Sequence, residues 1–215
     1  MDIVTGVGTL DKAVHVLRCI AERPRSLAEL EVASGLPRAT AHRLASALEA
    51  HGVLRRDADG RFDLGVELVS LGRTAAERFP IASLALPVLE RLRDETGESV
   101  QLFVREGSAR RCLVSLQSPH ALRWIVPEGV LFPLDVGSAG RVLASAAPRP
   151  EWVESVEERE PGVASVSAPV VDVDGHVIAA ISVSGPIERL TRRPGERLGD
   201  RAVAAARELS SLMGT

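Results

Sequence analysis

SLAELEVASGLPRATAHRLASALEAHGVLRRDADGRFDL, residues 26–64, is the stretch that decides the fold. It holds two short helical patterns on either side of a Gly-Leu-Pro break. Ser26 can cap the first helix, and Gly35 suits the left-handed residue that follows a helix end. Pro37 suits the start of the second helix, where its missing N–H costs nothing. The apolar positions expected inside are Leu27, Leu30, Val32 and Ala33, then Ala41, Leu44, Ala45 and Leu48.

The opposite face of the second helix is polar and cationic near its start. A recognition helix carries short donors and cations at the end that enters the major groove, and its dipole favours a phosphate there. Two short strands follow, Val53–Arg56 and Arg61–Leu64, joined by an Asp-Ala-Asp-Gly turn that predicts a hairpin, or wing. We therefore expect DNA contacts from Pro37, Arg38, Thr40, His42, Arg43 and Arg61.

A second interpretation stays open for this stretch. Any helical hairpin with a Gly-Pro break looks similar, and arginines on a helix are usually only solvated. Residues 1–78 contain 11 Lys and Arg against 11 Asp and Glu, so the basic charge is local. The hairpin arginines, Arg55, Arg56 and Arg61, favour DNA binding, and a dimer would be needed to build useful affinity.

The same half resembles a known family. TLDKAVHVLRCIAE at 9–22, an LP-x-x-T-x-x-R-L-x-x-x-L run at 36–48 and a wing ending G-R-F-x-L-G are specific in combination. EREPGVASVSAPV at 158–170 and AAISVSGPIERLT at 179–191 extend the match. Together they resemble the IclR family of bacterial transcription regulators, most nearly the NdgR/LtbR/AreB-type subgroup linked to amino-acid (leucine) biosynthesis and nitrogen-dependent control. The resemblance implies a DNA-binding domain, a linker helix that packs against its dimer mate and a GAF-like ligand domain.

Composition sets broad limits on the class of protein. The chain has 215 residues, 45% of them hydrophobic and 26% charged, with a net charge of −3, which suits two packed domains. Cys19 and Cys112 are isolated and lack C-x-x-C spacing. This pattern is typical of buried thiols in a reducing compartment. We see no apolar run long enough for a membrane span and no signal peptide, and we expect a cytoplasmic location.

The remaining chain predicts an α+β protein. We expect helices at Leu10–Glu22, with Thr9 or Asp11 as cap, and at 65–78, 84–96, 138–147 and 196–213. Leu10, Ala13, Val14, Leu17 and Ile20 are expected on one face of the first helix, and Leu86, Leu89 and Leu92 inside the helix at 84–96. Strands are expected at 99–105, 111–116, 122–126, 165–173 and 176–184, the last two joined at Asp174-Gly175. The domains are residues 1–78, a winged helix-turn-helix with linker helix, and 79–215, a GAF-like effector-binding and oligomerisation domain.

One departure from the family lies between Ala147 and Pro161. Family members usually carry some twenty or more extra residues before the segment that begins near Trp152. Either the segment is truly deleted or the sequence omits it, and in the second case ligand-contacting residues would be missing.

No catalytic constellation is found, and we expect neither an enzyme nor a cofactor. The five histidines have no carboxylate partner at ligand spacing, so a metal site is not expected. Asp172-Val173-Asp174-Gly175-His176 is similar to the opening of a calcium loop, but it lacks the later Glu. Two strand patterns flank it, so a hairpin turn is the better interpretation.

Binding of a small molecule is better supported. Gly137-Ser138-Ala139-Gly140 opens a helix whose backbone N–H groups suit a carboxylate. Ser182 and Ser184 share one face of an apolar strand, and a buried hydroxyl needs a partner, either a ligand or the backbone. The resemblance implies that the pocket is formed by Trp124, Phe132, Ser138, Ala139, Val163, Ser165, Ser182 and Ser184. Where some relatives carry an Asp this chain has Ser155, which argues against a glyoxylate-like effector.

These observations predict a regulator that binds a double-stranded operator as a homodimer or dimer of dimers. A small metabolite, an amino acid or carboxylate, would favour one arrangement of the paired DNA-binding units. Three alternatives remain: a constitutive regulator with a degenerate pocket, a metabolite sensor that does not bind DNA, and an enzyme whose N-terminal helices only dimerise.

Overall fold

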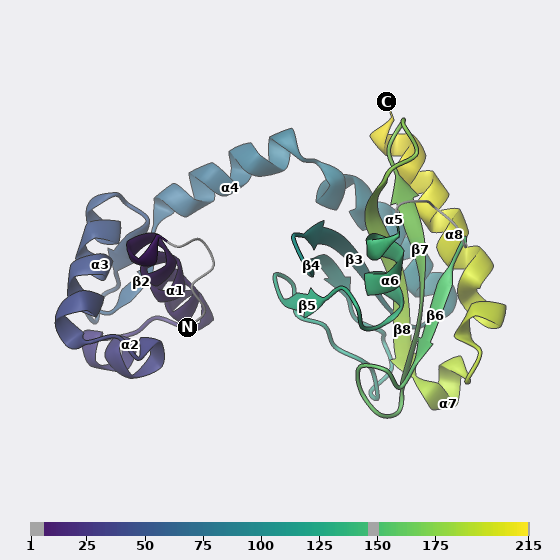
Figure 1. The fold of residues 1–215 in the computed structure, drawn as a ribbon, viewed down its shortest axis with the longest axis horizontal. Coiled ribbons are helices and arrows are strands. Elements are labelled where there is room, and N and C mark those ends of the chain that lie inside the picture. The colour runs from purple at the N-terminus through teal and green to yellow at the C-terminus, as the bar shows by residue number, and fades with distance from the viewer. Residues whose placement is uncertain (1–6, 146–150, 215) are drawn as a thin grey trace. The chain divides into compact units, whose positions relative to one another are not determined.

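The computed structural model describes residues 7–145 and 151–214 (Figure 1). The chain divides into two compact units, Met1–Arg78 and Phe79–Thr215. The elements of the first unit are α1 (Gly8–Glu22), α2 (Leu27–Ser34), α3 (Arg38–Ala50), β1 (Leu54–Arg56), β2 (Phe62–Leu64) and α4 (Val66–Arg78).

Local chemistry fixes the turn between α2 and α3. Ser26 accepts from the Glu29 N–H and the Glu29 side chain accepts from the Ser26 N–H, a complete capping box. Gly35 ends α2 at a φ of +63°, where a residue with a Cβ would be strained. Pro37 caps α3, and its carbonyl accepts from Thr40 and Ala41. The predicted helix-turn-helix is confirmed.

The wing is anchored to the small core of this unit. β1 and β2 pair antiparallel, with Leu54 opposite Leu64, and Phe62 is completely buried. Arg25 joins the wing to α1 and α2 because it exchanges backbone hydrogen bonds with Phe62. The residues buried in this core are Val16, Cys19, Ile20, Leu30, Leu36, Ala41, Leu44, Ala45, Leu54 and Phe62.

Three details of this unit differ from the prediction. No side chain caps α1, whose N-cap residue is Val7, so neither Thr9 nor Asp11 does so. The buried face of α1 is formed by Val16, Cys19 and Ile20, whereas Leu10 and Val14 are exposed. Val32 is 84% exposed, because two residues turn about 200° around a helix and Val32 therefore faces away from the buried Leu30.

The second unit begins with α5 (Ile81–Thr96), β3 (Ser99–Glu106), β4 (Ala109–Leu116), β5 (Leu131–Pro133) and α6 (Ser138–Ala144). It continues with β6 (Val153–Val156), β7 (Val163–Val171), β8 (Val177–Pro186), α7 (Ile187–Leu190) and α8 (Pro194–Met213). The strands that the structure describes form a six-stranded antiparallel sheet in the order β5-β4-β3-β8-β7-β6.

Both faces of this sheet are covered. α5 and α8 pack on one face over Val100, Leu102, Val166 and Ile181. α6 packs on the other face, where its Ala139, Val142 and Leu143 meet Phe103, Cys112 and Ala180 (Figure 1). The mixed helix-and-sheet class with an N-terminal helix-turn-helix is therefore confirmed.

A β-bulge decides which side chains of β4 face α6. Leu102 pairs with Val114, but the next residue, Phe103, pairs with Cys112, so Leu113 is the extra residue. Val114 therefore joins the core under α5 and α8 while Cys112 joins the core under α6. Simple alternation would place both on one side. Arg110, two residues before Cys112, lies on the α6 face as well.

Several predictions for this unit are wrong. Residues 122–126 form no strand, because the chain there crosses the α6 side of the sheet instead of pairing with it. Leu86 is 41% exposed on α5, whereas Leu89 and Leu92 are buried as predicted. The strands β5 and β6 and the short helix α7 have no counterpart in the prediction. The predicted end of a helix at Ala147 and the shortened segment after it lie at residues 146–150, outside the described residues.

Candidate functional sites

The start of α3 presents polar side chains outward. Ala39, His42 and Arg43 are exposed and share one face, with Ser46 half-buried beyond them. Thr40 is half-buried at the edge of this face, while Pro37 and Arg38 are exposed at the helix start. The inward face is formed by Ala41, Leu44 and Ala45, all buried. A groove of nucleic acid can therefore reach the side chains predicted to contact DNA.

The basic side chains of this surface differ in whether they form ion pairs within the protein. Arg38 lies 3.5 Å from a Glu31 oxygen in an exposed ion pair. Neither His42 nor Arg43 has a hydrogen-bond or ion-pair partner among the residues that the structure describes. An exposed ion pair contributes little, so all three side chains are available to phosphates or base edges.

The wing arginines divide into two that hold the hairpin and one that does not. Arg55 pairs with Asp63 at 2.5 Å and donates to the Leu64 carbonyl. Arg56 pairs with Glu49 at 3.3 Å, and its guanidinium lies 3.5 Å from the centre of the Phe62 ring. The exposed side chain of Arg61 has no such partner within the described parts of the chain. Of the three, Arg61 is therefore the one free to reach DNA.

The second unit contains a cavity between the sheet and α6. Seven of the eight residues predicted for a ligand pocket line it: Trp124, Ser138, Ala139, Val163, Ser165, Ser182 and Ser184. Phe132, the eighth, lies beside the cavity, with its ring 4.2 Å from the Arg159 guanidinium carbon. The cavity is small, about 30 Å³, whereas an engineered cavity that binds benzene measures roughly 150 Å³.

The buried serines of this cavity bond to one another instead of only to the backbone. Ser138 Oγ lies 2.7 Å from both Ser165 Oγ and Ser167 Oγ. Ser184 donates to Gln101 Oε1 at 2.8 Å. Ser182, which is 3% exposed, faces the same cavity from the neighbouring position on β8. The serines and Gln101 form a polar side of the cavity, and Trp124 and Val126 form an apolar side.

The helix start at Gly137 is already occupied by a carboxylate of this chain. Glu158 accepts from the Gly137 N–H at 3.1 Å and pairs with Arg141 at 2.6 Å. The sequence predicts that the N–H groups of this turn bind the carboxylate of a ligand. At Gly137 the N–H group instead donates to a carboxylate of the chain itself, that of Glu158. Ser155, where some relatives carry an Asp, is buried and lines the cavity nearby.

The sequence analysis missed two arginines of the cavity. Arg110 is 2% exposed and donates to the Pro133 carbonyl. Arg159 lies with its guanidinium carbon 4.9 Å from the Trp124 ring and 4.2 Å from the Phe132 ring. Burial, and after it the neighbouring charge of Arg159, lowers the pKa of Arg110 to about 10. Burial also lowers the pKa of Arg159.

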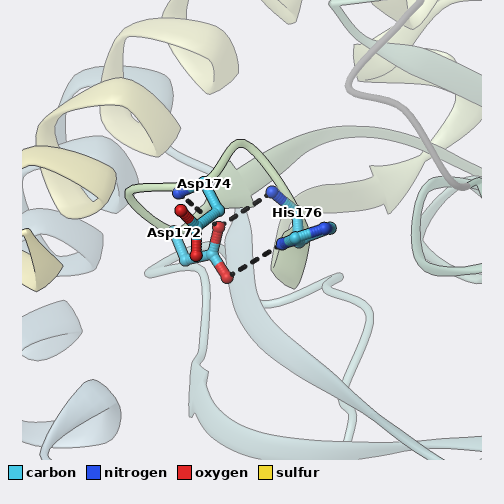
Figure 2. A group of neighbouring side chains, drawn as sticks. All are labelled: Asp172, Asp174 and His176. Carbon is cyan, nitrogen blue, oxygen red and sulfur yellow. Dashed lines mark hydrogen bonds and ion pairs between the residues drawn. The ribbon is translucent and has the colours of Figure 1, made fainter.

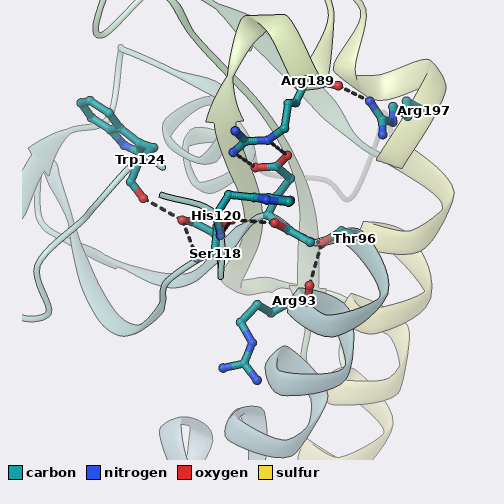
Figure 3. Close-up of polar contacts among 10 residues, drawn as sticks. Arg93, Thr96, Ser118, His120, Trp124, Arg189 and Arg197 are labelled. Atoms are coloured by element: carbon teal, nitrogen blue, oxygen red, sulfur yellow. Dashed lines mark hydrogen bonds and ion pairs between the residues drawn. The ribbon is translucent and has the colours of Figure 1, made fainter. Parts of the chain in front are cut away.

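A polar network holds the Trp124 segment against β3. Ser99 Oγ donates to the Trp124 carbonyl at 2.7 Å, and the Ser118 N–H donates to Ser99 Oγ at 3.0 Å (Figure 3). Ser118 Oγ in turn donates to the Gly97 carbonyl at the end of α5. Glu98, next to Gly97, makes a bidentate pair with Arg189 at 2.6 and 2.8 Å. These hydrogen bonds connect the Trp124 segment, which lines the cavity, to the end of α5.

The Asp172–His176 segment is a turn whose polar groups satisfy one another. Asp172 Oδ1 accepts from the backbone N–H groups of Asp174 and His176, and Oδ2 lies 3.5 Å from His176 Nδ1 (Figure 2). The hydrogen bond from the His176 N–H holds the pKa of Asp172 below its usual value. These three side chains are the one candidate metal group among the described residues, and their contacts close the predicted hairpin turn.

The fold of the first unit defines a winged helix-turn-helix protein, and comparison with known proteins gives the family. The family model for the IclR helix-turn-helix domain matches residues 9–58, and that for the bacterial transcriptional regulator IclR C-terminal domain matches 73–156 and 149–211. The chain belongs to the IclR family, whose members are transcriptional regulators and not enzymes.

Individual relatives agree with this assignment. The chain is 27% identical to the HTH-type transcriptional regulator KipR of Bacillus subtilis, with 96% of this chain and 97% of KipR covered. It is 26% identical to Pseudomonas aeruginosa HmgR, with a TM-score of 0.75 and 97% and 100% coverage. An IclR homologue from Microbacterium hydrocarbonoxydans, solved with 4-hydroxybenzoate, shares the fold at 22% identity and a TM-score of 0.77, with 94% and 99% covered. Across the described residues, no helix is long and apolar enough to cross a bilayer.

Proposed function

We propose that this DNA-binding regulator reads its operator with the start of α3 and the wing, and that a small carboxylate or amino acid in the cavity of the second unit controls it. The observation that carries the first part is that Arg43 and His42 are exposed on the outward face of α3 and pair with no residue that the structure describes. A reading surface must offer donors to DNA without first breaking internal contacts. Arg61 on the wing has the same property.

The proposal assigns residues 1–78 to DNA binding and 79–215 to effector binding and oligomerisation. The cavity supports the effector part because buried hydroxyls, an amide and two guanidinium groups converge in it. Action on chromosomal DNA would place the protein in the cytoplasm. Control of amino-acid genes, leucine biosynthesis among them, or of nitrogen genes rests on the resemblance of the sequence alone.

Assembly into a dimer or a dimer of dimers is part of the proposal. In α4, Val66 is 77% exposed, Val69 71% and Leu71 55%. No residue of α4 is buried within the single chain. Apolar side chains in this number on one helix favour a covering partner, and a second copy is the simplest one. Light scattering coupled to gel filtration would show a dimer or tetramer, and a monomer at micromolar concentration would contradict this part.

DNA binding is tested with the DNA upstream of the protein's own coding sequence. Fluorescence anisotropy would compare the unaltered chain, Arg43→Ala and the control Arg105→Ala, which changes an exposed arginine of β3 in the second unit. Loss of a groove contact by Arg43 should weaken binding by about tenfold or more, whereas the control should bind normally. Equal affinity for all three proteins at several salt concentrations would contradict the assignment of α3.

A second candidate, a constitutive regulator with a degenerate pocket, is favoured by the small size of the cavity. About 30 Å³ does not admit an amino acid unless a side chain moves. Thermal unfolding against a panel of amino acids and carboxylates separates the two, because a ligand that binds only the folded state raises the melting temperature.

A further inference from the structure

Arg110 is a buried cation that pairs with no carboxylate in the described parts of the chain. It is 2% exposed, one nitrogen donates to the Pro133 carbonyl, and its Nε has no partner. Arg110 forms no ion pair with any described residue, and the charge of exposed Asp135 acts on it without direct contact. A guanidinium is rarely removed from water without an anion. The position of the Arg110 side chain requires a glycine at residue 140, because a Cβ there would lie 2.5 Å from Arg110 Nη1.

Gln101 supplies a second unsatisfied donor to the same cavity. Its side chain is 1% exposed, and its Oε1 accepts from Ser184 while its Nε2 has no partner. Buried polar groups in native proteins are almost always paired, so two orphaned donors in one cavity indicate an absent acceptor. Both belong to residues that line the cavity, from the adjacent strands β3 and β4.

Arg159 occupies the aromatic side of this cavity. It lies on the segment between β6 and β7 and contacts the rings of Trp124 and Phe132. No hydrogen bond or ion pair holds its guanidinium to any described residue. Because the free space is only about 30 Å³, a ligand as large as benzene, which needs roughly 150 Å³, enters only when a side chain moves. Arg159 is a large lining side chain whose guanidinium has ring contacts alone among the described residues.

The charges around the cavity indicate the ligand's own charge. Two guanidinium groups line it, and the one lining carboxylate, Glu160, is exposed at its edge. Glu158, which is close by, is already paired with Arg141 and the Gly137 N–H. A zwitterionic amino acid would bring an ammonium group next to two unpaired cations. A molecule with two carboxylates would neutralise both, one at each arginine.

We propose that this pocket takes a small dicarboxylate, anchored by Arg110 and Gln101, and that Arg159 fills the aromatic slot until it swings to pair with the second carboxylate. This proposal rests on the proposed function, since it names the effector class of the same cavity. Arg110 is the fixed anchor because neighbouring backbone encloses it. Arg159 is the movable cation, and it exchanges ring contacts for an ion pair when the ligand enters.

The test measures binding to the full chain by calorimetry without DNA, so its outcome is independent of the α3 assignment. The probes are succinate, its neutral isostere succinamide, acetate and leucine. We expect succinate to bind at least tenfold more tightly than acetate or leucine, and succinamide not to bind. Failure of succinate to bind, or equal binding of succinate and succinamide, would overturn the proposal.

Variants separate the two arginines. Arg110→Gln should abolish binding of both succinate and acetate. Arg159→Ala should keep acetate binding and lose the preference for succinate. The matched control is Arg111→Gln, because Arg111 is the neighbour of Arg110 on β4 but pairs with Glu106 outside the cavity. Unchanged succinate affinity in Arg110→Gln, or an equal loss in Arg111→Gln, would overturn the assignment.

Movement of Arg159 has its own optical readout. Trp124 and Trp152 are the only tryptophans, so Trp152→Phe leaves Trp124 as the single reporter. The Arg159 guanidinium carbon lies 4.9 Å from the Trp124 ring, and its departure should change the emission. We expect succinate to change the emission in this background and Arg159→Ala to show the changed emission without ligand. Binding of succinate with no change in emission would contradict the swing of Arg159.

Discussion

Replacing Arg110 by methionine should stabilise the second unit while it removes the proposed anchor. The pKa of Arg110 is lowered to about 10 by burial and by the neighbouring charge of Arg159, which corresponds to roughly 3 kcal/mol against the charged side chain. At pH 7 the side chain is protonated in both the folded and the unfolded chain, so this penalty acts in full. It would be relieved only as the pH rises above about 10, where Arg110 of the folded chain loses a proton that the unfolded chain still holds.

The expected net effect is smaller than this penalty. Methionine is unbranched and apolar, so it can fill the site, but the hydrogen bond from the charged side chain to the Pro133 carbonyl is lost at about 1.5 kcal/mol or more. A gain of at most about 1.5 kcal/mol remains. For a unit of the size of residues 79–215, this raises the melting temperature by up to about 5 °C.

Differential scanning calorimetry at pH 7 measures the change, with Arg111→Met as control. Arg111 is paired with Glu106, a contact that raises the pKa of Arg111, so its loss should be neutral or destabilise by up to about 1 kcal/mol. A lower melting temperature for Arg110→Met than for Arg111→Met would refute the view that Arg110 is an uncompensated buried cation. It would indicate that Arg110 has a structural role.

Four further results are expected. Ser26→Ala removes the capping box and should destabilise the first unit by about 1 kcal/mol in urea unfolding. The pKa of the Glu29 carboxyl is lowered to about 2 by the Arg23 hydrogen bond and the Ser26 N–H, so Glu29 should titrate near pH 2 by NMR. Its stabilising contribution should be present above pH 4.5 and be lost as the pH falls towards 2. A titration midpoint near 4.5 would contradict the capping box. Phe62→Ala should destabilise the first unit by about 3–5 kcal/mol because the ring is completely buried and carries Arg56, so a loss below about 1 kcal/mol in chemical unfolding would be inconsistent with a wing anchored by this ring. Gly140→Ala puts a Cβ 2.3 Å from the Leu134 carbonyl oxygen and should lower the stability of the second unit by about 1–3 kcal/mol and weaken succinate binding; unchanged binding would show that the pocket does not depend on this close approach.

The helix-turn-helix could be predicted because its determinants are local. Ser26 and Glu29 cap the same helix from three residues apart, and Gly35 adopts the conformation that its position in the sequence requires. The positions of Ser182 and Ser184 could also be predicted, because side chains alternate between the two faces of a strand and both of these serines face the cavity. These patterns depend on neighbours in the sequence and not on tertiary structure.

The arginines of the cavity could not be found in this way. Arg110 faces the cavity only because the bulge at Leu113 exchanges the faces of β4, and nothing in the strand pattern signals that extra residue. Arg159 contacts Trp124 and Phe132 through the tertiary fold, across 27 to 35 positions of sequence. The segment around Trp124 looks like a strand because its residues are apolar, yet it crosses the sheet on the α6 side and is held by Ser99.

The most direct test of the account asks whether DNA covers the start of α3. Ala39 is exposed on the same face as Arg43, and its replacement leaves the proposed contacts intact. The native thiols of Cys19 and Cys112 are buried, and burial raises the pKa of each, so they should react slowly with an alkylating reagent. The variants Ala39→Cys and Ala204→Cys, the latter on exposed α8 surface, would be alkylated with and without operator DNA.

We predict that DNA slows alkylation of the Ala39→Cys thiol at least tenfold and leaves the Ala204→Cys thiol unaffected. Equal alkylation rates for the Ala39→Cys thiol in free and fully DNA-bound protein would contradict the central claim that this helix face reads the operator.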